Sequence, residues 1–268
     1  MKMDLGLRGK TAIVTGGASN IGKAIVEGLF EEGANIVIAD IDQVQADRVV
    51  DELRASGRSG ALFVKTDVAD RSQVERLVNR ALEAFERIDI LVNNAGWTIN
   101  GLFLDKSVEE WEREVDVNLW GPINCVRAVA PSMAARSYGK IITIGSDAGR
   151  VGEYQEAVYS ACKGGMIALS KALAREFGRF NVNVNVVCPG LTLPENPDDA
   201  GANSLWHSES PQSRIFQNED VLAKIVRKYP LRRIGIPGDL VPMVLLLASD
   251  KSSYITGQVI SVSGGYAM

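Results

Sequence analysis

The feature that most constrains the fold of this chain is an alternation of short apolar runs with amphipathic segments. The apolar runs are rich in β-branched residues and cover residues 11–15, 35–39, 61–66, 88–92, 140–144, 182–187 and 258–262. The segments between them have the length and the periodicity of helices. Strands that alternate with helices form βαβ units, in which helices cover both faces of a parallel sheet. The sequence therefore predicts an α/β fold with a doubly wound parallel sheet of about seven strands.

A glycine-rich turn, Gly16-Gly17-Ala18-Ser19-Asn20-Ile21-Gly22, follows the first predicted strand and precedes an amphipathic segment at residues 23–32. In this context small residues let the backbone approach a pyrophosphate, and the amides at the helix N-terminus supply partial positive charge. A plain connecting turn is the alternative. We expect the turn to bind a dinucleotide through Gly16, Ser19, Asn20, Ile21 and Gly22.

Asp40 stands at the end of the second predicted strand, 18 residues beyond Gly22. A carboxylate at this spacing accepts hydrogen bonds from the adenosine ribose and repels a 2′-phosphate. Ile41 follows and offers no guanidinium that would bind such a phosphate. The pair therefore predicts binding of NAD rather than NADP. The alternative is that Asp40 only caps the helix that is predicted to begin near Asp42.

Further candidate residues lie at the carboxyl ends of other predicted strands, where doubly wound sheets bind their ligands. We expect the side chain of Asp67 to accept a hydrogen bond from the adenine amino group. The small residues Ala95 and Gly96 leave room for the coenzyme, although close strand packing would explain them equally well. The candidates in this group are Asp67, Val68, Asn94, Ala95, Gly96, Pro189, Gly190 and Thr192.

A proton-transfer site is predicted around Tyr159 and Lys163, which lie four residues apart and therefore on the same face of a helix. A free tyrosine has a pKa of about 10, and a lysine ammonium one turn away favours the phenolate and lowers that pKa. Ser146 follows the fifth strand and is placed to hold a substrate oxygen beside the phenol. The alternative is an ordinary surface tyrosine and lysine.

Asn118 belongs to a long helical pattern at residues 108–136, and Pro122 follows it by four residues. A proline in a helix removes one backbone donor and disturbs the hydrogen-bond ladder near the preceding turn. We expect the carbonyl or the side chain of Asn118 to hold a water molecule there. A purely structural kink is the alternative.

Composition limits the classes of partner. The net charge of −4 gives no basic excess for nucleic acid, and no apolar run approaches the roughly 20 residues that span a bilayer. Three separated cysteines indicate reduced thiols, and a single histidine, His207, gives no basis for a metal site. A cytoplasmic protein without metal is expected, and its 268 residues fit a single domain.

Residues 191–218 break the alternation and are rich in Pro, Asn, Asp, Ser and Gly. A segment of this length without periodicity inside a compact domain is usually a lid or a loop. Because this segment follows Pro189-Gly190, we expect it to form a substrate lid that covers the nicotinamide end of the site. Five residues that flank the proposed catalytic atoms or lie in this lid are expected to contact a cyclic or bulky substrate: Trp97, Asp147, Glu153, Tyr154 and Trp206.

Together these motifs resemble the short-chain dehydrogenase/reductase family, in its compact single-domain branch, from about Gly6 to Met268. The resemblance rests on the glycine-rich turn, Asp67, Asn93-Asn94-Ala95-Gly96, Asn118, Ser146, Tyr159-x-x-x-Lys163 and Pro189-Gly190. It implies a Rossmann-like sheet and an NAD-dependent alcohol dehydrogenase or ketone reductase. One departure is Asn20, which stands where the family usually has its second glycine. Asn visits left-handed backbone angles readily, so we expect the turn to survive.

The resemblance also implies a mechanism and an assembly. Hydride passes between the nicotinamide and a carbonyl or carbinol carbon, while Tyr159 exchanges a proton with the substrate oxygen. Lys163 binds the nicotinamide ribose, and Asn118 anchors a relay of water to solvent. The helices that carry Asn118 and Tyr159 pair between subunits in a homotetramer or homodimer.

Two other functions stay open. One is reduction of a 3-oxoacyl thioester, of coenzyme A or of acyl carrier protein, by an NADPH-dependent member of the same family, against which Asp40 argues. The other is a regulator that binds a dinucleotide without turnover, although such a protein is expected to have lost Tyr159 or Lys163. The substrate is a small molecule in the enzymatic cases.

Overall fold

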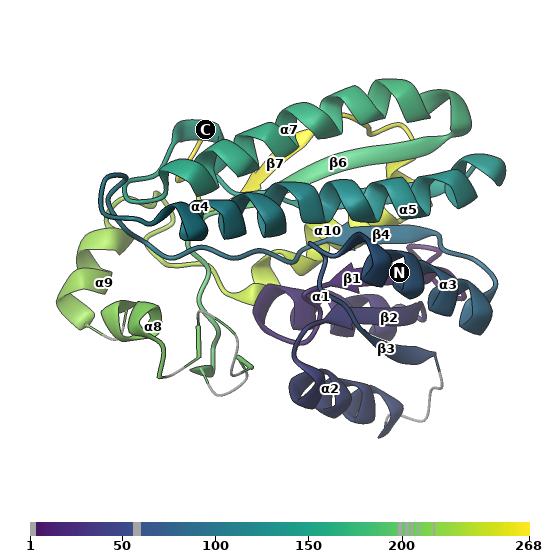
Figure 1. Cartoon of the computed structure of the whole chain (residues 1–268), viewed down its shortest axis with the longest axis horizontal. Coiled ribbons are helices and arrows are strands. Elements are labelled where there is room, and N and C mark those ends of the chain that lie inside the picture. The colour runs from purple at the N-terminus through teal and green to yellow at the C-terminus, as the bar shows by residue number, and fades with distance from the viewer. Residues whose placement is uncertain are drawn as a thin grey trace.

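The computed structural model of the protein describes residues 4–55, 60–197, 200–201, 204, 206–207, 209–216 and 218–268. Seven parallel strands form one sheet in the order β3-β2-β1-β4-β5-β6-β7 (Figure 1). The strands are β1 (Thr11–Thr15), β2 (Asn35–Asp40), β3 (Ala61–Lys65), β4 (Ile90–Asn93), β5 (Gly139–Ile144), β6 (Val182–Pro189) and β7 (Val259–Val262). The chain winds outward from β1 to β3 and then from β4 to β7. The predicted doubly wound sheet is confirmed.

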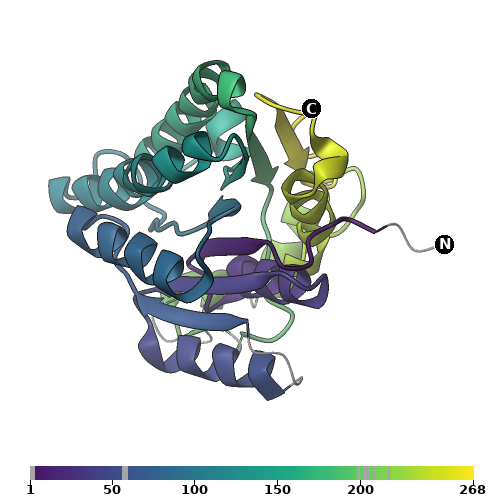
Figure 2. The ribbon, with the colours of Figure 1, turned by 90° about the vertical axis from the view of Figure 1, so that its right-hand side faces the viewer.

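Helices cover both faces of the sheet (Figure 2). One buried cluster joins α1, α2 and α10 to the sheet, and a second joins α3, α5 and α7 to the other face. The helices are α1 (Asn20–Glu31), α2 (Gln43–Ala55), α3 (Arg71–Phe85), α4 (Val108–Val115), α5 (Gly121–Ala135), α6 (Ala148–Val151), α7 (Ala157–Phe177), α8 (Pro211–Phe216), α9 (Glu219–Val226) and α10 (Val241–Ala248). A π-helical turn spans Asp116–Trp120, and 3-10 turns span Gly178–Phe180, Pro237–Asp239 and Asp250–Ser252.

Some predicted boundaries are wrong by a few residues. The amphipathic segment predicted at residues 23–32 forms the helix Asn20–Glu31, and the strand predicted at residues 88–92 forms at Ile90–Asn93. The helix that carries Tyr159 and Lys163 begins at Ala157, after Gln155 with φ 67°, and a 3-10 turn follows it from Gly178, which has φ −55°. The sequence pattern thus located the elements, while local backbone geometry set their ends.

Cys125, Cys162 and Cys188 are buried free thiols. Among the described residues, no helix combines the length and the apolar character that a membrane crossing requires. The same part of the chain holds no cluster of three or more His, Cys, Asp or Glu side chains arranged for a metal ion.

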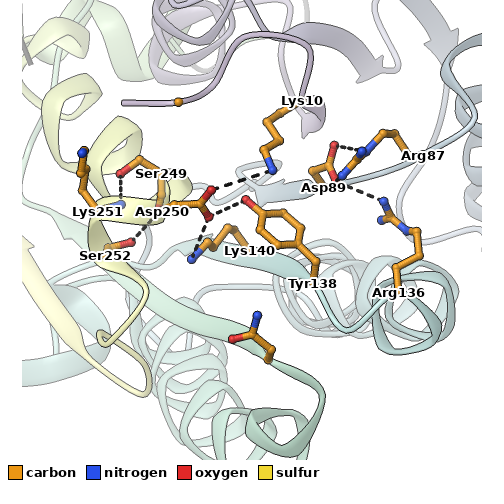
Figure 3. Close-up of polar contacts among 12 residues, drawn as sticks. Lys10, Arg87, Asp89, Arg136, Tyr138, Lys140, Ser249, Asp250, Lys251 and Ser252 are labelled. Carbon is orange, nitrogen blue, oxygen red and sulfur yellow. Dashed lines mark hydrogen bonds and ion pairs between the residues drawn. The ribbon is translucent and has the colours of Figure 1, made fainter. Parts of the chain in front are cut away.

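An ion network joins elements at the amino edge of the sheet, opposite the edge where the strands end (Figure 3). Asp89, just before β4, is fully buried and accepts hydrogen bonds from the Thr11 backbone at 3.0 Å and from two arginines. Arg87 lies 2.6 Å and Arg136 3.1 Å from the same carboxylate oxygen. Burial raises the pKa of Asp89, but the hydrogen bonds from Arg87 and Thr11 outweigh it and hold that pKa below its usual value. Asp89 thus ties β1, β4 and the end of α5 together.

A second carboxylate, Asp250, extends the network (Figure 3). The Tyr138 hydroxyl donates to it at 2.9 Å, and the amines of Lys10 and Lys140 both lie 3.9 Å away. Lys140 is buried and also donates to Asn183 at 2.7 Å. The turn after α10 is thereby held to the starts of β1, β5 and β6.

We expect Asp89→Asn to lower the free energy of unfolding by about 2–3 kcal/mol, at the low end for a buried pair because both arginines reach solvent. Chemical denaturation at pH 7 measures this loss. Asp47→Asn, at an exposed position on α2, is the matched control and should lose less than about 0.5 kcal/mol. Because the pKa of Asp89 is lowered by folding, the gap between wild type and variant should shrink as the pH falls through the acid range. Equal losses in the two variants would refute the role of the network.

Candidate active site

A cleft lies along the carboxyl edge of the sheet, between the glycine-rich turn, α4 and part of the segment after β6. It contains most of the residues that the sequence singled out. Those that line it are Gly16, Ser19, Asn20, Ile21, Gly22, Asp40, Ile41, Asp67, Val68, Asn94, Ala95, Gly96, Trp97, Tyr159, Lys163, Pro189 and Trp206. Parallel strands end at one edge, so residues that are far apart in the chain meet there.

The glycine-rich turn has the geometry that a pyrophosphate requires. A Cβ atom added to Gly22 would overlap the Gly16 carbonyl oxygen, and Gly16 itself has φ 62°. Asn20 begins α1 with φ 47°, so the asparagine adopts the left-handed backbone expected of it. Its Oδ1 atom is buried and has no hydrogen-bond partner in the described structure. The turn therefore offers a close backbone cradle to an anion, while the Asn20 Oδ1 atom, which is an acceptor, would need a donor from a ligand or from water.

Asn94 holds this turn against the sheet. Its side-chain nitrogen donates to the carbonyl oxygens of Thr15 at 3.0 Å and Gly16 at 2.9 Å. Its backbone amide donates to the Thr15 hydroxyl at 3.0 Å. The ends of β1 and β4 are thus joined directly beneath the cleft.

Asp40 braces the glycine-rich turn from the other side. Its Oδ2 accepts from the Ala18 amide and its Oδ1 from the Asp42 amide, both at 3.0 Å. Burial raises the pKa of Asp40, although these backbone hydrogen bonds oppose the rise. The side chain of Asp42, not that of Asp40, accepts from the Gln45 amide in the first turn of α2. The alternative role of Asp40 as a simple helix cap is therefore at most partial, because it also fixes the turn.

Tyr159 and Lys163 project from α7 into the cleft, near the end of β5. The Lys163 amine lies 5.4 Å from the centre of the Tyr159 ring and donates to the Ile144 carbonyl at 3.1 Å. The Ser146 side chain hydrogen-bonds the Tyr159 phenol. The three residues are therefore brought together as the sequence predicted.

Lys163 was expected to lower the pKa of the Tyr159 phenol, but burial has the largest effect on that pKa. Burial raises the pKa of Tyr159 well above its usual value, the carboxyl group of Glu156 adds to the rise, and the hydrogen bond from Ser146 opposes it. Burial also lowers the pKa of Lys163 to about 8. Both shifts have one cause, because loss of water penalises the phenolate and the ammonium alike.

Asn118 is fully buried in the π-helical turn that precedes α5. Pro122 cannot donate to the carbonyl four residues earlier, so the ladder is disturbed where the sequence predicted. The Asn118 side chain donates to the carbonyls of Trp97 at 2.6 Å and Glu114 at 2.8 Å, and accepts from the Trp97 amide at 3.2 Å. The side-chain amide is thus engaged with Trp97 and Glu114, so the backbone carbonyl is the remaining candidate to hold the predicted water.

Three of the five expected substrate residues point away from the cleft. Asp147 is buried and accepts a hydrogen bond from Ser261, Glu153 accepts one from Tyr266, and Tyr154 is 73% exposed. The reason is that α6 and the loop after it fold back onto the C-terminal segment. Closeness to Ser146 in sequence did not place these side chains in the same cavity.

Two expected coenzyme residues also lie beside the cleft rather than in its lining. Thr192 is buried, donates to the carbonyl of Gly190 at 3.2 Å and forms a parallel bridge with Gly235. Gly190 packs against Ser263 and Tyr229. Both residues therefore anchor the start of the segment that follows β6.

The predicted lid also differs from expectation in its course. Gly201 packs against Asp42 and Gln45, so this part of the lid lies at the Asp40 end of the cleft and not over Tyr159. Residues 198–199, 202–203, 205, 208 and 217 of the lid lie outside the described residues. The place of this segment after β6 predicted where the lid starts but not which end of the cleft it reaches.

Sequence reasoning missed a group of residues that complete the walls of the cleft. Those on α4 and the turn after it recur at helical spacing. The sequence shows this spacing, but it points to the site only when one face of that helix is known to border the cleft. The residues missed are Ala18, Ala39, Asp42, Gln45, Thr66, Ala69, Thr98, Glu109, Glu112, Arg113, Asp116, Val117, Ile144 and Gly145, while Gly201 and Ser204 belong to the predicted lid.

Comparison with known proteins identifies the same family that the sequence motifs resemble. The family model of the short chain dehydrogenases matches residues 10–203. The chain is 34% identical to the 3-oxoacyl-[acyl-carrier-protein] reductase FabG of Staphylococcus aureus, over 97% of this chain and 98% of the relative. It is 36% identical to the oxidoreductase UcpA of Salmonella typhimurium, over 97% and 95% of the two chains.

A solved structure from Agrobacterium tumefaciens, provisionally named a gluconate dehydrogenase, superposes with a TM-score of 0.88 at 30% identity and covers 99% of this chain and 98% of its own. The family model spans the glycine-rich turn, the Asn94 contact and the Tyr159–Lys163 pair, which the cleft brings together. This chain therefore belongs to the short-chain dehydrogenase family of oxidoreductases, whose members bind a nicotinamide dinucleotide.

Proposed function

We propose that this protein is an NAD-dependent oxidoreductase that interconverts a secondary alcohol and a ketone. The observation that carries the proposal is that Tyr159 and Lys163 lie in the same cleft as the glycine-rich turn and Asp40. A dinucleotide with its pyrophosphate on the turn and its adenosine ribose at Asp40 directs its other end toward Tyr159. Buried free thiols at all three cysteines support a reducing compartment such as the cytoplasm.

The residues of the cleft have distinct roles in this proposal. The bound coenzyme supplies or accepts the hydride. Tyr159 exchanges a proton with the substrate oxygen, and Ser146 orients that oxygen beside the phenol. Lys163 binds the nicotinamide ribose and, with a pKa of about 8, still carries positive charge at pH 7. The buried Asn118 carbonyl anchors the water that connects this site to solvent.

The coenzyme preference rests on Asp40 and Ile41. The Asp40 carboxylate stands in the cleft at the end of β2, and Ile41 beside it supplies no positive charge. A 2′-phosphate placed there would meet a fixed negative charge, whereas ribose hydroxyls would donate to it.

The substrate has two candidates. Trp97 and Trp206 in the cleft favour a cyclic or bulky alcohol, and the similar solved structure is provisionally named a gluconate dehydrogenase. The relatives named 3-oxoacyl-[acyl-carrier-protein] reductase favour a 3-oxoacyl thioester. A panel of cyclic secondary alcohols and 3-hydroxyacyl thioesters, followed by NADH formation, separates them. Dinucleotide binding without turnover on the whole panel would favour a regulator.

We also propose a homotetramer or homodimer that assembles through α5 and α7. An apolar groove lies between the outer faces of these helices and is open to solvent. It is lined by Ile123, Val126, Arg127, Ala130, Pro131, Ala134, Leu169, Leu173 and Phe177. A second copy that presents the same face would bury these side chains in a two-fold interface.

Tyr159→Phe should reduce kcat by at least about 100-fold and leave the dissociation constant of NADH nearly unchanged, because the hydroxyl serves proton transfer. Steady-state rates and NADH fluorescence titration measure the two quantities. Tyr154→Phe, which alters an exposed tyrosine on the loop before α7, is the control and should keep full activity. Similar rates for wild type and Tyr159→Phe would remove the phenol from the mechanism.

Asp40→Asn should shift the NAD to NADP ratio of kcat/KM toward NADP by about tenfold, because it removes the charge that opposes a 2′-phosphate. The amide keeps one of the two acceptors that Asp40 offers to the backbone amides of Ala18 and Asp42. Asp67→Asn makes the same charge change at the end of β3 and should shift the ratio much less. An unchanged ratio in Asp40→Asn would assign the preference to another group.

Leu169→Glu should break the two-fold interface and at least halve the mass of the oligomer, because it places a charge in the apolar groove of both partners. Size-exclusion chromatography with light scattering gives the mass of each species. Val44→Glu, at an exposed position on α2, is the matched control and should leave the mass unchanged. A monomeric wild type would refute the proposed assembly.

A further inference from the structure

A buried ion pair lies behind one wall of the cleft, between the loop that follows β4 and the helix α4. The Lys106 amine donates to Glu114 Oε1, and the two side chains are 6% and 0% exposed. The methylene groups of Lys106 pack against Gly101, where an added Cβ would lie 3.0 Å from the lysine Cγ. Burying two charges costs free energy, and the proposed mechanism gives this pair no role.

The ion pair lies at the Tyr159 end of the cleft, where α4 runs beside α7 (Figure 1). The Glu114 backbone carbonyl accepts a hydrogen bond from Asn118 Nδ2 at 2.8 Å, and Cys162 Sγ on α7 lies 3.8 Å from the same oxygen. Burial is the main cause of the raised pKa of Tyr159, and the carboxylate of Glu114 is among the charges that add to it. Glu114 is therefore a neighbour of the proposed catalytic residues.

Thr98 connects this ion pair to the cleft. Thr98 lines the cleft, and its hydroxyl donates to Glu114 Oε1 at 2.7 Å. A hydroxyl group has one proton and two lone pairs, whereas a carboxylate in an ion pair can only accept. Because Glu114 takes the only proton of the Thr98 hydroxyl, the Thr98 oxygen can act toward the cleft only as an acceptor.

Two more acceptors at this wall lack a donor among the residues that the structure describes. Glu114 Oε2 and Asn100 Oδ1 are buried and have no hydrogen-bond partner there. Asn100 belongs to the loop that carries Thr98, and the amide of the next residue, Gly101, donates to the Gln155 carbonyl at 3.1 Å. A ligand that supplies donors would therefore suit this wall, whereas an apolar group would leave its acceptors unpaired.

We propose that Thr98 determines substrate specificity by accepting a hydrogen bond from a second hydroxyl group of the substrate, so that a diol or polyol is preferred to an alcohol with one hydroxyl. The inference rests on the proposed function, because it takes the reacting carbinol to lie at Tyr159. Glu114 is a positioning residue in this role, since it holds the Thr98 proton away from the cleft, and Lys106 balances its charge. The acyl group of a 3-hydroxyacyl thioester has no second hydroxyl for this contact.

The discrimination follows from the cost of an unpaired acceptor. A substrate hydroxyl that donates to Thr98 replaces the water that the oxygen would otherwise bind. A hydrocarbon group at the same place excludes that water and supplies no donor. Thr98 is only 9% exposed, so solvent gives little compensation. A site that hydrogen-bonds a substrate hydroxyl therefore discriminates against the analogue that lacks it.

The test compares cyclohexanol with the cyclohexanediols, and isopropanol with propylene glycol, by the kcat/KM of NADH formation in the full chain. With the preferred stereoisomer, wild type should oxidise each diol at least about tenfold more efficiently than its partner with one hydroxyl, well beyond the roughly twofold gain from a second carbinol. Thr98→Val has a similar shape without the hydroxyl and should reduce this ratio about 3–10-fold, mainly through the KM of the diol. The cyclohexanol kinetics and the dissociation constant of NADH should stay nearly unchanged. Thr98→Ser is the matched control, because it keeps the hydroxyl and should keep the ratio of wild type.

The outcomes separate this inference from the function on which it rests. Wild type that binds NADH but oxidises none of these alcohols and no 3-hydroxyacyl thioester would overturn both. Wild type that oxidises the alcohols with one hydroxyl, or 3-hydroxyacyl thioesters, as efficiently as the diols would overturn the inference alone, and this comparison holds even if Thr98→Val unfolds. A diol preference that survives in Thr98→Val would also overturn it, because another group would then recognise the second hydroxyl. Equal losses of Thr98→Val on cyclohexanol and on the diols would show a purely structural role and would overturn it as well.

Discussion

The hydrogen bonds from the Asn94 side chain to the ends of β1 and to Gly16 are the contacts on which the cleft depends. They lie at the point where the chain switches from winding toward β3 to winding toward β7, so that no helix fills the space above the two strands. Gly22 must lack a side chain because a Cβ there would come within 2.6 Å of Asn94 Nδ2. The sheet topology opens the crevice, and the Asn94 amide together with Gly16 and Gly22 forms the surface at its base.

Burial, rather than charge pairing, has the largest effect on the pKa values of Tyr159 and Lys163, the proposed catalytic pair. The Tyr159 pKa is raised and the Lys163 pKa is lowered, so both residues are pushed toward their neutral forms. A protonated phenol can donate a proton, as ketone reduction requires. Alcohol oxidation needs the phenolate instead, and the groups that favour it are the Ser146 hydrogen bond and the Lys163 ammonium. In the proposed function, the preferred direction of the reaction would follow the strength of these two interactions with the phenol.

The sequence predicted those parts of the fold and site that depend on local patterns. The strand and helix order, the left-handed Asn20 and the convergence of Tyr159, Lys163 and Ser146 follow from periodicity, turn chemistry and parallel strands. Asp147 was misplaced because its environment is set by Ser261, 114 residues away along the chain. The course of the segment at Gly201 depends on packing against α2, which no pattern within the segment encodes.

The two edges of the sheet differ in how completely their polar side chains are paired. At the amino edge, the buried carboxylate of Asp89 and the exposed carboxylate of Asp250 are matched by four cationic side chains and a tyrosine hydroxyl. At the carboxyl edge, polar atoms such as Asn20 Oδ1 lack a partner in the described structure, and Asp40 is used only by backbone amides. A buried polar atom without a partner costs folding free energy, which a ligand that supplies the partner restores as binding affinity. Such atoms are tolerable at one edge because the ion networks at the other hold the same strands together.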